Sequence, residues 1–296
     1  MGLYCGRFAP SPTGPLHLGS LIAAVASFLD ARSNKGLWLV RMDDLDPPRE
    51  EPGAAQDILR SLQIHGLQWD KPVVWQSQRH RAYQAALSQL DLAGIVFPCD
   101  CTRARLSTLT AYDGHCRHRT QVHPPHALRV RVHSGSDIAF FDRIQGSCSS
   151  HLDRESGDFV IKRKDQLYAY QLAVAVDDAF QGISHIVRGA DLLDSTARQI
   201  YLMQQLGFTT PSYAHIPVIT DDNGHKLSKQ THAPALLESD ASSNLRYALA
   251  FLGQPLAPSS ARNPEQILNF ARDVWSLSSI PKVREHCGQF AAKHHQ

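Results

Sequence analysis

The sequence predicts an α/β protein built on a doubly wound, mostly parallel sheet. Residues 3–8 (LYCGRF) and 37–41 (LWLVR) are short apolar runs of strand length, and residues 16–32 between them repeat apolar side chains at the helical period. A strand, a helix and a second strand in this order form a βαβ unit, which requires parallel strands. With 43% hydrophobic residues in a chain of 296, the core suffices for one large domain or two modest ones.

We expect four segments along the chain. Residues 1–95 hold the first half of the sheet, with a second helical pattern after residue 54. Residues 96–158 differ in character, because cysteines, histidines and arginines lead into alternating pieces such as ALRVRV, which predicts an insertion. Residues 159–232 return to the parallel pattern, with strands at FVIKR, ISHIVR and HIPVI. Residues 233–296 predict a short, mainly helical C-terminal stem.

The overall charge does not indicate a polyanionic partner. Lysine and arginine number 30 against 28 aspartate and glutamate, a formal charge of +2, so a polyanion would have to bind a local patch. Phosphate contact and simple exposure explain the two basic groups equally well: Arg103, Arg105, Arg117 and Arg119, and Lys162, Arg163 and Lys164. No apolar stretch approaches the roughly 20 residues of a membrane span, and the N-terminus lacks a signal pattern. We therefore expect a cytoplasmic protein with no membrane partner.

A turn-rich loop at residues 9–20 precedes the first helix. Gly14 permits a tight backbone and Gly19 removes a side chain early in the helix, so a polyphosphate can approach the positive end of the helix dipole. His17 is placed to contact that anion. A proline- and glycine-rich turn with a capping histidine accounts for the same residues about equally well.

A second loop, at residues 221–230, carries two lysines three positions apart, Lys226 and Lys229, with Ser228 between them. Ammonium groups on a mobile loop suit phosphates whose charge must be neutralised in the transition state. Taken alone, a solvated basic loop is the more common meaning of such a pattern. The two loops together favour nucleotide binding.

Four ordered stretches carry a resemblance to a known family. RFAPSPTGPLHLGS and HKLSKQ resemble the HIGH and KMSKS signatures of class I aminoacyl-tRNA synthetases, and RMDDLDPPRE and LYAYQLAVAVDD resemble two stretches of the glutamyl branch. The resemblance covers residues 1 to about 235. It implies a Rossmann-like catalytic sheet with an inserted zinc-containing segment. It also implies an ATP-dependent ligase that joins the α-carboxylate of glutamate to the α-phosphate of ATP, with Mg²⁺ as companion of ATP.

The resemblance also implies where the small substrates bind. The catalytic residues would be His17, Gly19, Lys226 and Lys229. The ATP site would comprise Pro10, Thr13, Gly14, His17, Gly19, Ser20, Ser228 and Lys229. The glutamate site would comprise Arg7, Ala9, Ser11, Asp43, Tyr170 and Arg188. Ligands of doubly wound sheets bind beyond strand ends, and two arginines with one acid complement the two carboxylates and one ammonium of a dicarboxylic amino acid.

Two positions depart from the pattern of the glutamyl branch. Asp43 stands where glutamate is usual and Val174 where asparagine is usual; a shorter acid and a lost amide predict weaker or altered glutamate binding. Ser20 and Gln230 replace the last residues of the two signatures and leave their other groups intact. Pairing with a structural carboxylate is the simpler explanation of either pocket arginine taken alone.

Three cysteines, Cys99, Cys101 and Cys116, lie close together in the sequence. In a reducing compartment such a cluster favours a metal over disulfides, and its spacing suits one structural, tetrahedral zinc. Buried reduced cysteines are the alternative. The fourth ligand is open among Tyr112, His115 and His118, and residue chemistry alone favours a histidine. A C-x-C…Y-x-x-x-C pattern, which resembles that of short synthetases of this branch, favours Tyr112.

Chain length bears on the second substrate. Only 66 residues follow Gln230, too few for the large anticodon-binding region of the glutamyl branch. We therefore expect a monomer similar to the short paralogues, which activate glutamate without tRNA and transfer it to queuosine at the wobble position of tRNA(Asp). The alternatives are a truncated synthetase that charges a tRNA 3′ end, a non-catalytic tRNA-binding paralogue and, least favoured, a small-metabolite nucleotidyltransferase.

Overall fold

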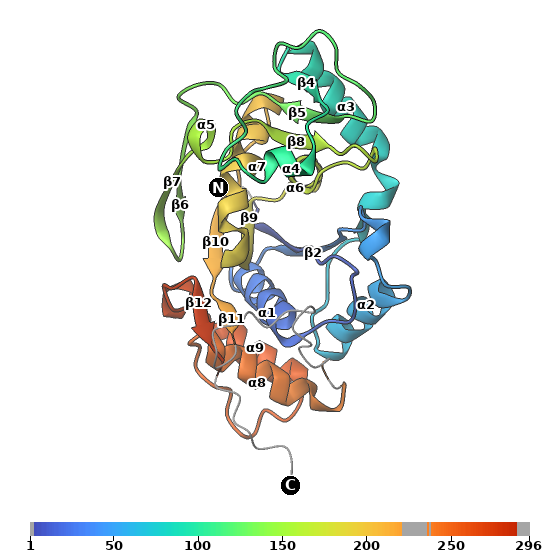
Figure 1. Cartoon of the computed structure of the whole chain (residues 1–296). Coiled ribbons are helices and arrows are strands. Elements are labelled where there is room, and N and C mark those ends of the chain that lie inside the picture. The colour runs from blue at the N-terminus through green and yellow to red at the C-terminus, as the bar shows by residue number, and fades with distance from the viewer. Residues whose placement is uncertain (1–2, 221–235, 237, 289–296) are drawn as a thin grey trace.

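The computed structural model confirms the predicted α/β fold with parallel strands (Figure 1). The structure describes residues 3–220, 236 and 238–288. The strands are β1 (Cys5–Phe8), β2 (Leu37–Met42), β3 (Val74–Trp75), β4 (Val96–Cys99), β5 (Ala127–Val130), β6 (Asp137–Asp142), β7 (Gly146–His151), β8 (Phe159–Lys162), β9 (His185–Gly189), β10 (Ser212–Ile216), β11 (Val218–Thr220) and β12 (Glu285–Cys287). The helices are α1 (Leu18–Ser33), α2 (Ala54–Ile64), α3 (His80–Leu92), α4 (Arg103–Leu106), α5 (Leu152–Glu155), α6 (Tyr170–Phe180), α7 (Leu193–Leu206), α8 (Ala241–Phe251) and α9 (Pro264–Val274).

The predicted βαβ unit is confirmed. β1 and β2 pair in parallel with Arg7 opposite Leu39, and α1 connects them. β3 extends this sheet in parallel beside β2. β9 and β10 form a second parallel pair, and the backbone N–H of Ser184 donates to the carbonyl of Cys5 at 2.9 Å. The start of β9 therefore lies next to β1, which brings both halves of the parallel architecture together.

One strand and one hairpin pair differently from the prediction. Residues 159–162 (β8) do not join the parallel sheet; they pair antiparallel with β5, which also pairs antiparallel with β4. The hairpin β6–β7 of the predicted insertion instead adds to the β9–β10 sheet, where Asp142 lies opposite Tyr213. In β8, buried and half-buried residues alternate, as in an antiparallel sheet covered on one face. The four segment boundaries stay a prediction.

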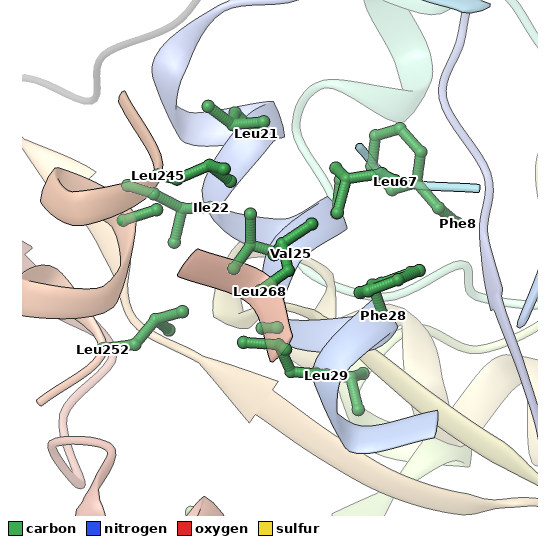
Figure 2. Packing of buried hydrophobic residues seen from close by; sticks show 14 of the residues in the cluster. Phe8, Leu21, Ile22, Val25, Phe28, Leu29, Leu67, Leu245, Leu252 and Leu268 are labelled. Carbon is green, nitrogen blue, oxygen red and sulfur yellow. The ribbon is translucent and has the colours of Figure 1, made fainter. Parts of the chain in front are cut away.

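The main hydrophobic core surrounds α1, whose residues 21–22, 24–26 and 28–29 are buried (Figure 2). They pack against residues from α8 and α9, including Leu245 and Leu268, and against Leu67 after α2. The helical period predicted for residues 16–32 places the right side chains inward, except that Leu18 is only partly buried. The C-terminal helices therefore complete the core behind the N-terminal strands.

The described part of the C-terminal stem is mainly helical, as predicted, but it also contains a strand. After α9 the chain forms β12, which pairs in parallel with β11. All three residues of β12 are exposed and include Glu285 and His286, so the sequence carries no apolar strand pattern there. Among the described residues, no helix combines the length and apolar character that crossing a membrane requires.

Candidate functional site

A cavity of about 520 Å³ lies where β1, β9 and β10 end. The loop after β1, the start of α1, the start of α6 and residues 216–219 enclose it. Eight predicted site residues line this cavity: Arg7, Ala9, Pro10, Ser11, Thr13, His17, Gly19 and Ser20, and Tyr170 and Arg188 join them from the second half of the chain. The structure thus brings together most of the predicted small-substrate residues that it describes.

The loop before α1 shapes one wall of the cavity. His17 has extended backbone geometry and caps α1, since its Nδ1 accepts from the backbone N–H of Ser20 at 3.3 Å. A Cβ on Gly19 would lie 3.2 Å from both His17 Cε1 and Ile219 Cγ2, tighter than ordinary contact. His17 therefore both caps α1 and lines the cavity. The N-terminus of this 16-residue helix faces the cavity, where it favours binding of an anion.

The stretch RMDD is tied to this loop. The backbone N–H of Asp43 donates to the carbonyl of Pro10 at 2.9 Å. The Asp43 carboxylate is buried and accepts from Arg41 Nε at 2.7 Å, and it does not line the cavity. Burial raises the pKa of Asp43 to about 6, against the opposing charge of Arg41. Asp43 therefore stands one layer behind the cavity wall.

Arg7 combines a structural ion pair with a cavity position. Its Nε donates to Asp178 Oδ1 at 3.2 Å, and both side chains are almost fully buried. No other described residue accepts from its two Nη groups, so these remain available to a ligand in the cavity. Arg7 thus pairs with a structural carboxylate, and this pairing is compatible with its predicted role in glutamate binding.

Arg188 is held by neutral acceptors. Its Nε donates to His215 Nε2 at 3.0 Å, and its Nη groups donate to Gln199, Thr196 and the carbonyl of Leu192. Pairing with a carboxylate, the simpler explanation from sequence, is wrong for this residue within the described part of the chain. Four of the five guanidinium N–H groups are used, which leaves one for a ligand.

His215 fixes the orientation of Arg188. Since His215 Nε2 accepts from Arg188, its proton lies on Nδ1, which donates to Asp142 Oδ2 at 2.6 Å. Burial lowers the pKa of His215, although Asp142 opposes this effect. Sequence reasoning missed His215, Asp142 and Asp178. The only available signals were a histidine in the HIPVI strand and the DD pair that ends LYAYQLAVAVDD.

Several predicted positions lie elsewhere. Gly14 has φ +135° and does not line the cavity. Val174 is fully buried in α6 and does not line it either. Lys226, Ser228 and Lys229 lie outside the described residues, although Val218 and Ile219 just before them line the cavity. Sequence reasoning did not name Asp191, which lines the cavity after β9.

The three clustered cysteines converge. Among the described residues, the Sγ atoms of Cys99, Cys101 and Cys116 all lie within 4.8 Å of one another and are buried. The Tyr112 hydroxyl lies 3.5 Å from Cys99 Sγ and 3.9 Å from Cys101 Sγ, and it accepts from the backbone N–H of Cys116 at 2.9 Å. Tyr112 is buried, whereas His115 is exposed. The Tyr112 hydroxyl oxygen therefore lies beside the cysteine thiols.

The basic groups near the cysteines are largely neutralised. Arg105 pairs with Asp113, Arg117 with Asp158, and Arg119 with Asp100. Arg163 pairs with Asp46 and Asp165. These pairs favour neither phosphate contact nor simple exposure, because a phosphate can compete with an exposed carboxylate for an arginine.

The chain is similar to known proteins in both sequence and fold. The family model described as tRNA synthetases class I (E and Q), catalytic domain, matches residues 5–249. The glutamyl-Q tRNA(Asp) synthetase of Thiobacillus denitrificans is 54% identical over 285 residues, which cover 93% of this chain and 94% of that protein. Its counterpart from Burkholderia cenocepacia is 53% identical over 295 residues, covering 95% and 98%. The crystal structure of a glutamate-tRNA synthetase from Elizabethkingia anophelis has a TM-score of 0.80 at 23% identity over 95% of this chain and 67% of that one, which shows the fold.

Proposed function

Because the chain belongs to the glutamyl-Q tRNA(Asp) synthetases, within the class I tRNA synthetase family, we propose that it activates glutamate with ATP and transfers it to queuosine in tRNA(Asp). The observation that carries the proposal is the cavity in which Arg7 and Arg188 meet the N-terminus of α1. The arginines suit the carboxylates of glutamate, and the helix terminus suits the phosphates of ATP.

In the first step an oxygen of the glutamate α-carboxylate attacks the α-phosphate of ATP, and pyrophosphate leaves. A carboxylate needs no general base, so the protein contributes positioning and charge stabilisation. His17 and the first N–H groups of α1 would stabilise charge on the phosphates, together with Lys226 and Lys229 of the second loop. Mg²⁺ would enter with ATP and neutralise part of its charge.

The roles within the amino-acid pocket follow from the hydrogen bonds already made. Arg7 offers two Nη groups and can grip a carboxylate with both, whereas Arg188 offers one N–H. Tyr170 lines the cavity at the start of α6, and Ala9 and Ser11 line it from the loop. The negative charge of Asp43, which lies behind the residues that line the cavity, would attract the ammonium group of glutamate.

In the second step a hydroxyl of the queuosine cyclopentenediol attacks the carbonyl carbon of glutamyl-AMP, and AMP leaves. The diol resembles the vicinal diol of a terminal ribose, so the same catalytic cavity suits either acceptor chemically. The names of the relatives favour queuosine of tRNA(Asp). We expect a cytoplasmic monomer, since its substrates are amino acid, ATP and tRNA.

We also propose that Cys99, Cys101, Tyr112 and Cys116 hold one structural Zn²⁺. A tetrahedral zinc with Zn–S of about 2.3 Å and Zn–O of about 2.0 Å separates two sulfurs by about 3.8 Å and a sulfur from an oxygen by about 3.5 Å. The Sγ atoms of Cys101 and Cys116 lie 3.6 Å apart, and the two Tyr112 contacts to sulfur are 3.5 and 3.9 Å. The donor set therefore fits zinc, which when bound would cross-link residues 99–116.

Pyrophosphate exchange tests the first step. We expect glutamate-dependent ATP–pyrophosphate exchange without tRNA, and a reduction by about 100-fold in His17→Ala, since one lost electrostatic donor typically costs that much. Absence of exchange with glutamate in the unaltered protein would contradict the proposal and support the non-catalytic paralogue.

Transfer assays test the second step. Radiolabelled glutamate should be attached to tRNA(Asp) that contains queuosine and not to tRNA(Asp) that lacks it. Attachment to the 3′ end of tRNA(Glu) alone would favour the truncated glutamyl-tRNA synthetase instead.

A further inference from the structure

The carboxylate of Asp178 joins two arginines from neighbouring strands. Its Oδ1 accepts from Arg7 Nε at 3.2 Å and from Arg41 Nη1 at 2.6 Å. Asp178 belongs to α6, while Arg7 and Arg41 belong to β1 and β2, which pair in parallel. All three side chains are at most 4% exposed, so water does not compete for these hydrogen bonds.

Arg41 extends this connection to Asp43. Its Nε donates to Asp43 Oδ1 at 2.7 Å, and Arg41 itself is fully buried, so it cannot reach a ligand. Arg7, Asp178, Arg41 and Asp43 therefore form one continuous chain of alternating charge. Its two ends are the cation and the acid that the proposed glutamate site requires.

Electrostatics explain why the carboxylate is needed at this position. Arg7 and Arg41 are like charges that share one acceptor atom, and an ionised Asp178 offsets their repulsion in a buried setting. Burial raises the pKa of Asp178, but the charges of Arg7 and Arg41 outweigh this effect and the net pKa is lowered. Asp178 is thus an anion at neutral pH.

The neighbouring residue Asp177 is a carboxylate whose hydrogen bonds go to residues other than Arg7 and Arg41. Its Oδ1 accepts from Arg79, and its Oδ2 accepts from Gln76 and Tyr83, so both oxygens are satisfied. Asp178 Oδ2 is buried and accepts no hydrogen bond among the described residues. A buried carboxylate oxygen without a partner is costly, which argues that Asp178 is placed for its arginines rather than for its own stability.

We propose that Asp178 is a positioning residue for glutamate: it orients the guanidinium of Arg7 directly and the carboxylate of Asp43 through Arg41. This inference rests on the proposed function. By occupying Nε, Asp178 fixes the plane of the guanidinium and leaves both Nη groups for a substrate carboxylate. Within the part of the chain that the structure describes, its hydrogen bonds go to Arg7 and Arg41 and not to residues 9–20, so we expect its effect to fall on the amino acid rather than on ATP.

The test uses the full chain and three variants, Asp178→Asn, Asp177→Asn and Asp178→Glu, in ATP–pyrophosphate exchange. For Asp178→Asn we expect the KM for glutamate to rise at least 10-fold while the KM for ATP changes less than twofold, by analogy with residues that orient metal ligands, whose loss typically costs about 10- to 100-fold. Asp177→Asn should lower thermal stability and leave the KM for glutamate within twofold. Asp178→Glu keeps the negative charge, so its KM for glutamate should lie between that of the unaltered protein and that of Asp178→Asn.

A double-mutant cycle with Arg7→Ala tests whether Asp178 influences glutamate binding through Arg7. If Asp178 acts through Arg7, Asp178→Asn should raise the glutamate KM less in the Arg7→Ala background than in the unaltered protein. Should Asp178→Asn fail to fold, Arg41→Lys takes its place, because a single ammonium cannot reproduce the fork that joins Asp178 to Asp43. The inference is overturned if the glutamate KM is unchanged in the folded variant. It is also overturned if Asp177→Asn and Asp178→Asn have equal effects on the KM values for both substrates. Either result leaves the proposed function standing. No glutamate-dependent exchange in the unaltered protein overturns the proposed function, and this inference with it.

Discussion

Asp43 is an acid whose buried surroundings favour protonation of its carboxylate. Burial raises its pKa to about 6, although Arg41 and Arg7 oppose the effect. Because the folded-state pKa lies above the ordinary value of 3.8, the stability that this group contributes is full below about pH 4 and is lost as pH rises through about 6. At neutral pH the ionised carboxylate therefore costs folding free energy, as expected for a group kept for binding rather than for stability.

The same pKa predicts how glutamate recognition depends on pH. Asp43 is ionised above pH 6 and protonated below it, so the attraction for the substrate ammonium weakens as pH falls. We expect the KM for glutamate in pyrophosphate exchange to rise several-fold between pH 7 and pH 5. In Asp43→Asn the KM should already be high at pH 7 and change little over this range.

The KM for ATP, measured in the same titration, serves as the control for effects on the nucleotide. A glutamate KM with the same pH dependence in Asp43→Asn and in the unaltered protein would rule out Asp43 as the titrating group.

At the residue scale, sequence reasoning located the groups and missed their partners. Arg7 and Arg188 were expected at the cavity because they follow or end short strands, a local pattern. Asp178, which holds Arg7, lies 171 positions away, and His215, which holds Arg188, lies 27 positions away on another strand. No periodicity in one segment encodes a hydrogen bond to another segment, so these partners emerge only from the folded chain.

At the element scale, strand pairing departed from prediction in β8 and in the β6–β7 hairpin. β8 has four residues and β5 has four, and such strands carry too little pattern to select a partner sheet. The longer βαβ unit was predicted correctly, because α1 alone supplies four helical turns of consistent burial. A long helix between two strands fixes how they pair, whereas a strand without such a neighbour can join either sheet.

The segment around the cysteines has a small hydrophobic core, which the proposed zinc would reinforce. Its buried cluster comprises Phe97, Cys99, Cys101, Tyr112 and Cys116, and its helix α4 has four residues. We expect the purified protein to contain about one zinc per chain, and removal of zinc by a chelator to lower the melting temperature and to open residues 100–126 to protease. Elemental analysis, differential scanning calorimetry and limited proteolysis measure these three outcomes.

Variants of the candidate ligands distinguish the fourth donor. Tyr112→Phe should weaken zinc binding, whereas His115→Ala and His118→Ala should leave zinc content unchanged. Loss of zinc in a histidine variant with retention in Tyr112→Phe would transfer the ligand role to that histidine. A protein that retains its melting temperature after complete zinc removal would contradict the structural role.

At the scale of the whole molecule, one core unites the two ends of the described chain. Leu268 of α9 packs in the same cluster as Val25 of α1, and Figure 2 shows the two side chains beside each other. α1 also presents its N-terminus to the cavity, so the C-terminal helices support the helix that forms part of the site. The sequence predicts a helical stem but not the element on which it packs, because the helical period of one segment does not identify its partner.

The shared core predicts that α9 and the N-terminal strands unfold together. Leu268→Ala removes a side chain that is 5% exposed, and we expect it to lower the free energy of unfolding by about 2–5 kcal/mol through lost burial and a residual cavity. Urea unfolding should remain a single transition, coincident by far-UV circular dichroism and tryptophan fluorescence. Leu92→Ala, at a residue 90% exposed, is the matched control and should change the free energy by less than about 0.5 kcal/mol. Two separate transitions in Leu268→Ala, the first without loss of pyrophosphate exchange, would show instead that the C-terminal helices fold as an independent unit and that α1 does not need them to hold the cavity.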